Sequence, residues 1–239
     1  TAKLRWNASV YSSTNYDDIQ FISADASGRG YFNNVGETRR SGFDGSVSGS
    51  LEKLSVMAGY SYIDATYETE QTRLSSNNSS ADMSGLITVK PGDQIPLVPH
   101  HTFKLAANYA LLPSLNVGAT GLLFSSSYAR GNENNQDPNG KIPGYGILNL
   151  NANYAIDNKW SVFARVDNVL DKTYYTAGQL GASPFSANGV MNYTNYVSGS
   201  GTTYSNRFTP DDQNATFYAP GAPRAGWIGV RYEFGGLAK

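Results

Sequence analysis

The chain has 239 residues, enough for one all-β domain, and its 18 basic and 19 acidic residues give a net charge of −1. This near-neutral charge gives no electrostatic reason to expect nucleic acid as a partner, and the lack of cysteine excludes disulfides, thiol catalysis and cysteine-ligated zinc. The two histidines are the neighbours His100 and His101, which argues against a multi-histidine metal site, so we predict neither a metal site nor a cofactor.

Hydropathy leaves two classes of protein open. The mean hydropathy is −0.40, and no stretch approaches the roughly 18 consecutive apolar residues that a membrane-spanning helix needs. A transmembrane β-barrel shows only one apolar residue in two, however, so its average resembles that of a soluble protein. The 17 tyrosines and 3 tryptophans fit the aromatic belts of such a barrel and fit a secreted β-sandwich equally well.

Alternation of apolar and polar residues predicts β-strands along the whole chain. We expect strands at 3–22, 31–50, 54–68, 99–110, 115–128, 144–156, 159–174 and 223–234. In the last of them, Ile228, Val230 and Tyr232 fall on one face, opposite Trp227 and Arg231 on the other. An apolar face opposite a face that carries ions suits a barrel wall between lipid and a polar interior, although a sandwich strand would alternate too.

The connections between these strands separate the two classes. Short connections at 51–53, 111–114 and 157–158 alternate with long polar ones at 23–30, 69–98, 129–143 and 175–222. Outer-membrane barrels have short periplasmic turns and longer extracellular loops, whereas a sandwich has no reason to sort its loops in this way. The predicted fold class is therefore all-β, an antiparallel transmembrane β-barrel segment of about eight strands. The last strand then runs down towards the periplasm.

Four segments resemble the C-terminal half of TonB-dependent outer-membrane receptors. Residues 166–175, V-D-N-V-L-D-K-T-Y-Y, are similar to the family's V-D-N-L-F-D-K-x-Y, and residues 220–234, which begin P-G-A-P-R, resemble its terminal strand. Residues 34–43 and 95–101 agree as well. The spaced apolar residues Ile228, Val230, Tyr232 and Phe234 resemble the signal that the outer-membrane assembly machinery recognises. The family usually ends at such an aromatic residue, but here 235–239 follow.

This resemblance implies a barrel of 22 strands, of which residues 1–239 would supply the C-terminal part. The plug domain, its TonB-contacting box and the N-terminal strands are absent from this sequence. The implied location is the outer membrane of a Gram-negative bacterium. The implied activity is uptake of a scarce nutrient, energised by the TonB complex through the missing plug. A ferric siderophore is the expected ligand, with cobalamin, haem, carbohydrates and other metal chelates as alternatives. Outer-membrane lipids and the assembly machinery are the further expected partners.

Candidate binding residues follow from position within this framework. The expected extracellular ligand contacts are Tyr128, Arg130, Glu133, Tyr174, Tyr175, Tyr204 and Arg207. Arginine would hold an anionic group and tyrosine offers a flat amphipathic surface, but tyrosines of an interfacial belt and solvated loop arginines would give the same pattern. The residues expected to face the plug from the lumen are Arg39, Lys104, Arg165 and Arg231. Asn135, Asp137 and Asn139 match the first half of a calcium loop, yet Gly146 stands where its bidentate glutamate is needed.

Two alternative functions remain open. A self-contained eight-stranded outer-membrane barrel with a structural or adhesive role would show the same strands, but its interior would be filled by side chains and leave no transport pore. A secreted sandwich or lectin-like binder would be soluble without detergent. No G-x-S-x-G or comparable catalytic motif is present, so we expect no enzymatic activity.

Overall fold

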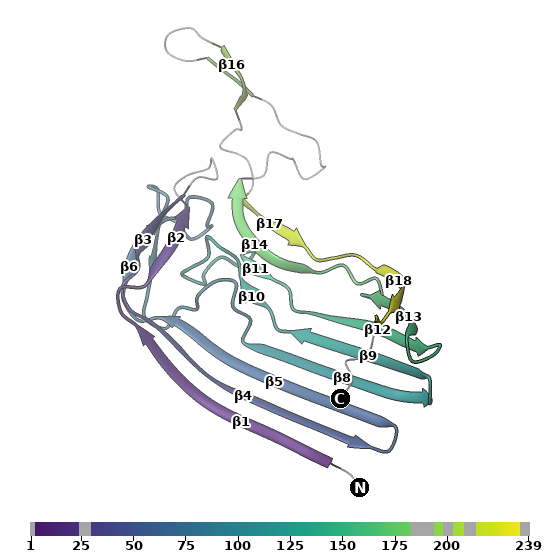
Figure 1. Cartoon of the computed structure of the whole chain (residues 1–239). Helices are drawn as coiled ribbons and strands as arrows, with labels where there is room; N and C mark the ends of the chain where they lie inside the picture. The colour runs from purple at the N-terminus through teal and green to yellow at the C-terminus, as the bar shows by residue number, and fades with distance from the viewer. Residues whose placement is uncertain (1–2, 24–29, 183–193, 198–202, 208–213, 235–239) are drawn as a thin grey trace.

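The computed structural model describes residues 3–23, 30–182, 194–197, 203–207 and 214–234. Their main feature is one antiparallel sheet of eight strands, whose order in the sheet follows the order of the chain (Figure 1). These strands are β1 (Lys3–Asn15), β4 (Thr38–Leu51), β5 (Leu54–Tyr67), β8 (His101–Leu112), β9 (Leu115–Phe124), β12 (Tyr145–Ala155), β13 (Trp160–Asp167) and β18 (Ala225–Tyr232). No helix in the described ranges is long and apolar enough to cross a membrane.

Shorter strands pair in twos beyond one end of this sheet. They are β2 (Ile19–Ser23) with β3 (Gly30–Asn34), β6 (Gln71–Leu74) with β7 (Leu86–Val89), β10 (Ser127–Tyr128) with β11 (Lys141–Ile142), β14 (Tyr175–Ala182) with β17 (Asn214–Pro220), and β15 (Thr194–Val197) with β16 (Thr203–Arg207). The tight turns, together with the N-terminal end of β1, lie at the opposite end of the sheet (Figure 1). The predicted sorting of short and long connections is therefore confirmed.

The eight predicted strands correspond, in order, to the eight strands of the main sheet, with corrections to their bounds and with further short strands. The predicted strand 3–22 is two strands, β1 and β2, because Asp17 adopts the left-handed conformation with a φ of 55° and turns the chain. The predicted strand 31–50 is likewise divided into β3 and β4. The pairs β6–β7 and β14–β17 lie within segments that were predicted to be loops.

The register gives the sheet two unlike faces. One row across five strands joins Asn108, Gly118, Asn151, Arg165 and Trp227 as successive cross-strand partners, and we call their side the polar face. The next row joins Tyr109, Val117, Ala152, Ala164 and Ile228 on the apolar face. The predicted alternation is therefore confirmed across these five strands.

Apart from the upper ends of β4 and β5, neither face of the sheet is buried by the described residues of this chain. On the apolar face Trp6 is 76% exposed, Val10 81% and Ile228 79%. An antiparallel sheet in a soluble protein normally buries its apolar face in a core. This sheet instead presents that face to its surroundings, which is the arrangement expected of a surface covered by lipid.

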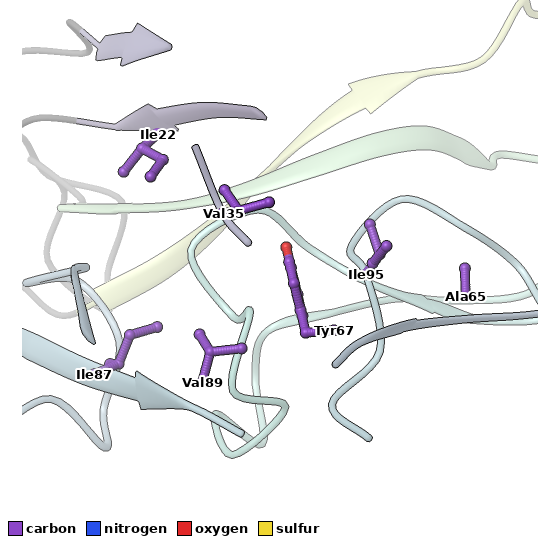
Figure 2. Packing of buried hydrophobic residues seen from close by; sticks show 7 residues of the cluster. All are labelled: Ile22, Val35, Ala65, Tyr67, Ile87, Val89 and Ile95. Atoms are coloured by element: carbon purple, nitrogen blue, oxygen red, sulfur yellow. The ribbon is translucent and has the colours of Figure 1, made fainter. Parts of the chain in front are cut away.

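The buried core lies among the loops. Figure 2 shows the cluster of Ile22, Val35, Ala65, Tyr67, Ile87, Val89 and Ile95. These residues come from β2, from the upper end of β5, from β7 and from the connections beside them, so they join segments that are up to 73 positions apart, from Ile22 to Ile95. The short strand pairs β2–β3, β6–β7, β10–β11 and β14–β17, with the connections beside them, thus form a packed body at one end of the sheet. We call this body the loop cluster.

Residues 166–175 and 220–234, the two segments whose motifs most resemble the receptor family, lie against each other. Asn168, 2% exposed and with a φ of 49°, donates from Nδ2 to the carbonyl oxygens of Lys172 at 2.9 Å and Ala222 at 3.2 Å. Arg224 reaches Asp171 with its guanidinium at 3.5 Å. The asparagine thus ends β13 and fixes the approach of the chain to β18, as expected for a side chain that bonds nearby backbone in a turn.

Candidate functional site

The loops of the cluster are joined by backbone hydrogen bonds. Arg130 donates to the carbonyl of Gly178 at 2.9 Å and accepts from Leu180 at 2.8 Å, which ties the segment after β10 to β14. Leu97 donates to the carbonyl of Tyr128 at 2.8 Å. Because the connections are bonded to one another, the side chains that they carry are held in defined places.

Buried asparagines join the two polar loops 69–98 and 129–143. Asn78 Nδ2 donates to the carbonyl of Gly131 at 2.8 Å and to Asn134 Oδ1 at 3.0 Å, and Asn134 Nδ2 donates to Ser80 at 2.8 Å. Asn78 is 2% exposed and Asn134 3%. Buried amides that are fully hydrogen-bonded specify one arrangement of the segments they link, so this serine- and asparagine-rich sequence forms a structural joint.

The residues that match half of a calcium loop belong to the same joint. Asp137 accepts backbone N–H bonds from Ser79 at 2.8 Å, Asn139 at 2.8 Å and Gly140 at 3.1 Å. Asn135 bonds both backbone groups of Gln94. These oxygens are therefore engaged in holding backbone. Within the described ranges, no three His, Cys, Asp or Glu side chains are grouped so as to hold a metal ion.

A row of aromatic rings follows the upper edge of the polar face. Phe124 and Tyr145 are cross-strand partners in β9 and β12, and their ring centroids are 4.9 Å apart. Tyr174 extends the row, with its ring 4.6 Å from that of Tyr145. All three residues are half-buried, so part of each remains accessible. We call this set the aromatic row, and it offers the flat, amphipathic surface that stacks against planar ligands.

Two more of the predicted ligand contacts pack inside the loop cluster. Tyr175 stacks on Tyr218 with a centroid distance of 4.4 Å, and Tyr218 donates its hydroxyl proton to the carbonyl of Lys141 at 3.0 Å. The Lys141 ammonium lies 4.9 Å from the ring centroid of Tyr128. Tyr128 and Tyr175 thus lie at the β11–β14–β17 junction, while Tyr174 belongs to the aromatic row.

The charged candidates are placed separately. Arg130 is exposed, and its guanidinium carbon lies 5.9 Å from the ring centroid of Phe21. Glu133 accepts a hydrogen bond from the backbone N–H of Gly131 at 3.1 Å. Tyr204 and Arg207 lie on the backbone of β16, and their side chains fall outside the described part of the chain. The seven predicted contacts therefore divide among the aromatic row, the loop interior and the loop surface.

Three of the four cations predicted to face the lumen share the polar face, and the fourth does not. Lys104, Arg165 and Arg231 lie on that face. The prediction for Arg39 was wrong. Arg39 lies four residues before Phe43 on β4, and Phe43 is the cross-strand partner of Val10 on the apolar face, so Arg39 lies on that face too. There its guanidinium forms an ion pair with Glu68 at 3.2 Å.

Further charged and aromatic contacts complete the two faces. Arg165 pairs with Asp167 at 2.7 Å, and Arg231 lies over the Phe163 ring at 6.0 Å. On the apolar face the Tyr232 ring packs 4.6 Å from both Trp160 and Phe234. Ile228, Val230 and Tyr232, which belong to the expected assembly signal, thus all lie on the apolar face. Residues 235–239 lie outside the described residues.

Sequence reasoning missed Phe124 and Tyr145 as site residues. Both lie at the upper ends of their strands, β9 and β12. Tyr145 lies six residues before Asn151, an even number, so strand alternation would have placed it on the same polar face. The paired strands β14 and β17, which help to frame the loop cluster, had no comparable signal. Their glycines and small residues do not alternate.

Comparison with known proteins places this architecture. The family model described as TonB dependent receptor-like, beta-barrel matches residues 1–169. The chain is 28% identical over 144 residues to the probable TonB-dependent siderophore receptor PiuA of Acinetobacter baumannii, which covers 60% of this chain and 18% of that protein. It is 30% identical over 146 residues to the probable TonB-dependent receptor BfrD of Bordetella pertussis, covering 59% of this chain and 18% of the relative.

Solved structures agree on the fold. The crystal structure of the siderophore receptor PiuA from Acinetobacter baumannii aligns with a TM-score of 0.60 at 20% identity, over 96% of this chain and 26% of that one. The copper transporter OprC aligns with a TM-score of 0.60 at 19% identity, over 97% and 29%. The chain thus spans about a fifth of the two curated relatives and just over a quarter of these structures. Because the family model covers most of the sequence, this chain belongs to the TonB dependent receptor-like β-barrel family.

Proposed function

We propose that this chain forms part of the barrel wall of an outer-membrane receptor that imports a ferric siderophore with energy from the TonB complex. The observation that supports this most is the two-faced sheet, with an exposed apolar face and a packed loop cluster at one end only. A relative is described as a siderophore receptor and another as a ferric-pyoverdine receptor. These names support iron chelates as the ligand class.

Six of the eight strands of the sheet are long enough to cross a membrane, while β13 and β18 have 8 residues each. A tilted transmembrane strand needs about 9–11 residues, and the strands β4 and β5 have 14 each. In the proposed orientation the apolar face meets lipid, the tight turns face the periplasm and the loop cluster lies outside the cell. The excess length of β4 and β5 then carries the loop cluster above the membrane.

In this orientation the aromatic row lies at the extracellular mouth of the lumen. A ferric siderophore presents planar, oxygen-rich groups around the metal, and aromatic rings stack on such groups. We propose Phe124, Tyr145 and Tyr174 as ligand contacts, with the exposed Arg130 available for an anionic group. Tyr128, Glu133 and Tyr175 would act mainly by supporting the loops, and Tyr204 and Arg207 remain proposed contacts from β16.

The plug domain, the TonB contact and the remaining strands would be supplied by other parts of the receptor. Lys104, Arg165 and Arg231 would then meet the plug from the polar face. The energy for release would come from TonB, so we assign no catalytic chemistry, no cofactor and no resident metal to this chain. The lipids of the outer membrane would cover the apolar face, and the assembly machinery would recognise its C-terminal strand.

Transport of labelled iron tests this proposal. A strain that lacks the full-length gene should take up less radiolabelled iron from catecholate or pyoverdine-type siderophores under iron limitation, and the intact gene should restore uptake. Restoration should fail when TonB is inactivated. Uptake that does not depend on TonB, or a protein that fractionates as soluble, would contradict the proposal and favour the adhesive barrel or the secreted binder.

A further inference from the structure

A buried arginine of the loop cluster has no ion-pair partner among the described residues. Arg73, on β6, is 5% exposed. Its Nη1 atom lies 3.3 Å from the hydroxyl oxygen of Tyr67, and its guanidinium carbon lies 4.7 Å from the centroid of that ring. Among the described residues, neither Nε nor Nη2 of Arg73 has a hydrogen-bond partner. A buried charge without a partner is costly, so it calls for an anion.

The two unpaired nitrogens form one recognition edge. In a guanidinium group the Nε and Nη2 protons point to the same side, opposite the Nη1 atom that contacts Tyr67. This edge presents two parallel N–H bonds that match the two oxygens of a carboxylate. Arg73 is therefore held by one nitrogen, and its two-pronged edge is unpaired but covered by neighbouring residues, so a carboxylate reaches it only when the segments around β6 open.

A third donor lies on the same side of the strand. Gln71 is two residues before Arg73, so the two side chains leave β6 on one face, and Gln71 Nε2 is also buried without a partner within the described part of the chain. Their cross-strand partners in β7 are Val89, 0% exposed, and Ile87, 2% exposed. The donors thus stand in apolar surroundings, where a hydrogen bond to a charged group is strong.

The nearby carboxylates are already engaged. Asp18 and Glu133 both act electrostatically on Tyr67. Asp18 accepts from Thr38 and Arg40, and Glu133 accepts from the backbone of Gly131. We propose that Gln71 and Arg73 form a binding site for one carboxylate group that comes from outside the described residues. One positive charge and three donors fit a singly charged carboxylate better than a dianion.

Such a carboxylate has two possible sources, and one experiment separates them. It belongs either to an acidic side chain elsewhere in the full-length receptor or to a soluble ligand. The experiment measures hydrogen–deuterium exchange of the β6 and β7 amides in the full-length protein in detergent, with sodium acetate as the probe and sodium chloride at equal ionic strength as the reference. The variants are Arg73→Met, Arg73→Lys and, as a matched control, Lys90→Met at the exposed cation after β7.

If the carboxylate is soluble, acetate should slow exchange of these amides about tenfold in the wild type and in Lys90→Met, but not in either Arg73 variant. If it belongs to the receptor, acetate should have no effect, and both Arg73 variants should exchange about tenfold faster because the receptor's carboxylate loses its partner. Arg73→Lys keeps the charge and loses the two-pronged edge, so it separates carboxylate binding from packing on Tyr67.

Two results would overturn the site. Unchanged exchange in Arg73→Lys, together with no response to acetate, would mean that the free edge of the guanidinium binds nothing. Loss of protection in Glu133→Gln equal to that in Arg73→Met would place the partner inside this chain. The test of this site does not depend on the proposed import, because it measures hydrogen–deuterium exchange and not iron uptake.

Discussion

Asp18, in the turn after β1, accepts a hydrogen bond from the hydroxyl of Thr38, at the start of β4, with an oxygen–oxygen distance of 2.8 Å. Thr38 is fully buried, and Arg40 reaches the same carboxylate oxygen at 3.3 Å. This contact joins the β2–β3 extension to the wall at the point where the predicted continuous strand is broken. It therefore fixes how the loop cluster stands on the sheet.

This contact predicts a pH dependence. Burial raises the pKa of the Asp18 carboxyl, but hydrogen bonds from Thr38, Gln20 and Arg40 and the charge of Arg40 outweigh it, so the net pKa is lowered. A lowered folded-state pKa gives stability that is present above the unfolded-state value and is lost as the pH falls through the folded-state value. Asp18→Asn should therefore increase protease sensitivity of the loop cluster at neutral pH.

The difference between the variant and the wild type should disappear in acid, below the folded-state pKa of Asp18. Asp17→Asn is the matched control, since Asp17 is exposed at the neighbouring position. A difference that persists unchanged in acid would show that Asp18 acts through its shape and not through its charge.

The joint between the polar loops predicts a local loss of stability in Asn78→Ala. The substitution removes the hydrogen bonds from Asn78 Nδ2 to the carbonyl of Gly131, which keeps its bond from Ser75, and to Asn134 Oδ1. Each lost hydrogen bond contributes about 0.5–1.5 kcal/mol to stability. Hydrogen exchange in residues 129–143 should accelerate accordingly. Asn77→Ala should leave it unchanged, because the Asn77 side chain forms no hydrogen bond with the described residues. Equal exchange in both variants would contradict the role of the joint.

The wall was predictable from the sequence because strand alternation is a local property. Asn151 and Ala152 point to opposite faces in any extended strand, and turn residues such as Asp157 mark where strands end. The loop cluster was not predictable in this way. The strand β6 has four residues, and Arg73 is buried where Tyr67 and Ile87, which are 20 residues apart in the sequence, meet beside it. Such long-range packing leaves no periodic signal.

The two faces of the wall predict that the same substitution destabilises the protein strongly at one position and weakly at the neighbouring one. Leu150 lies on the apolar face of β12 and Asn151 on the polar face. An arginine on the lipid face near the bilayer centre costs about 2–4 kcal/mol, whereas a lumen position tolerates it. Leu150→Arg should lower the unfolding free energy of the full-length protein in lipid vesicles by that amount. Asn151→Arg should change it by less than about 1 kcal/mol, and the reverse order would mean that the faces are assigned wrongly.

The aromatic row predicts where ligand affinity is lost. Tyr145 lies between Phe124 and Tyr174, so Tyr145→Ala removes the central ring of the row. Loss of one aromatic contact, worth about 0.5–1.5 kcal/mol beyond its area, should raise the Kd for a ferric siderophore about tenfold. Tyr154→Ala, on the apolar face of the same strand, should leave the Kd unchanged. Fluorescence titration of the full-length receptor measures both constants. If Tyr154→Ala weakens binding as much as Tyr145→Ala does, the effect comes from the stability of β12 and the row is not the ligand surface.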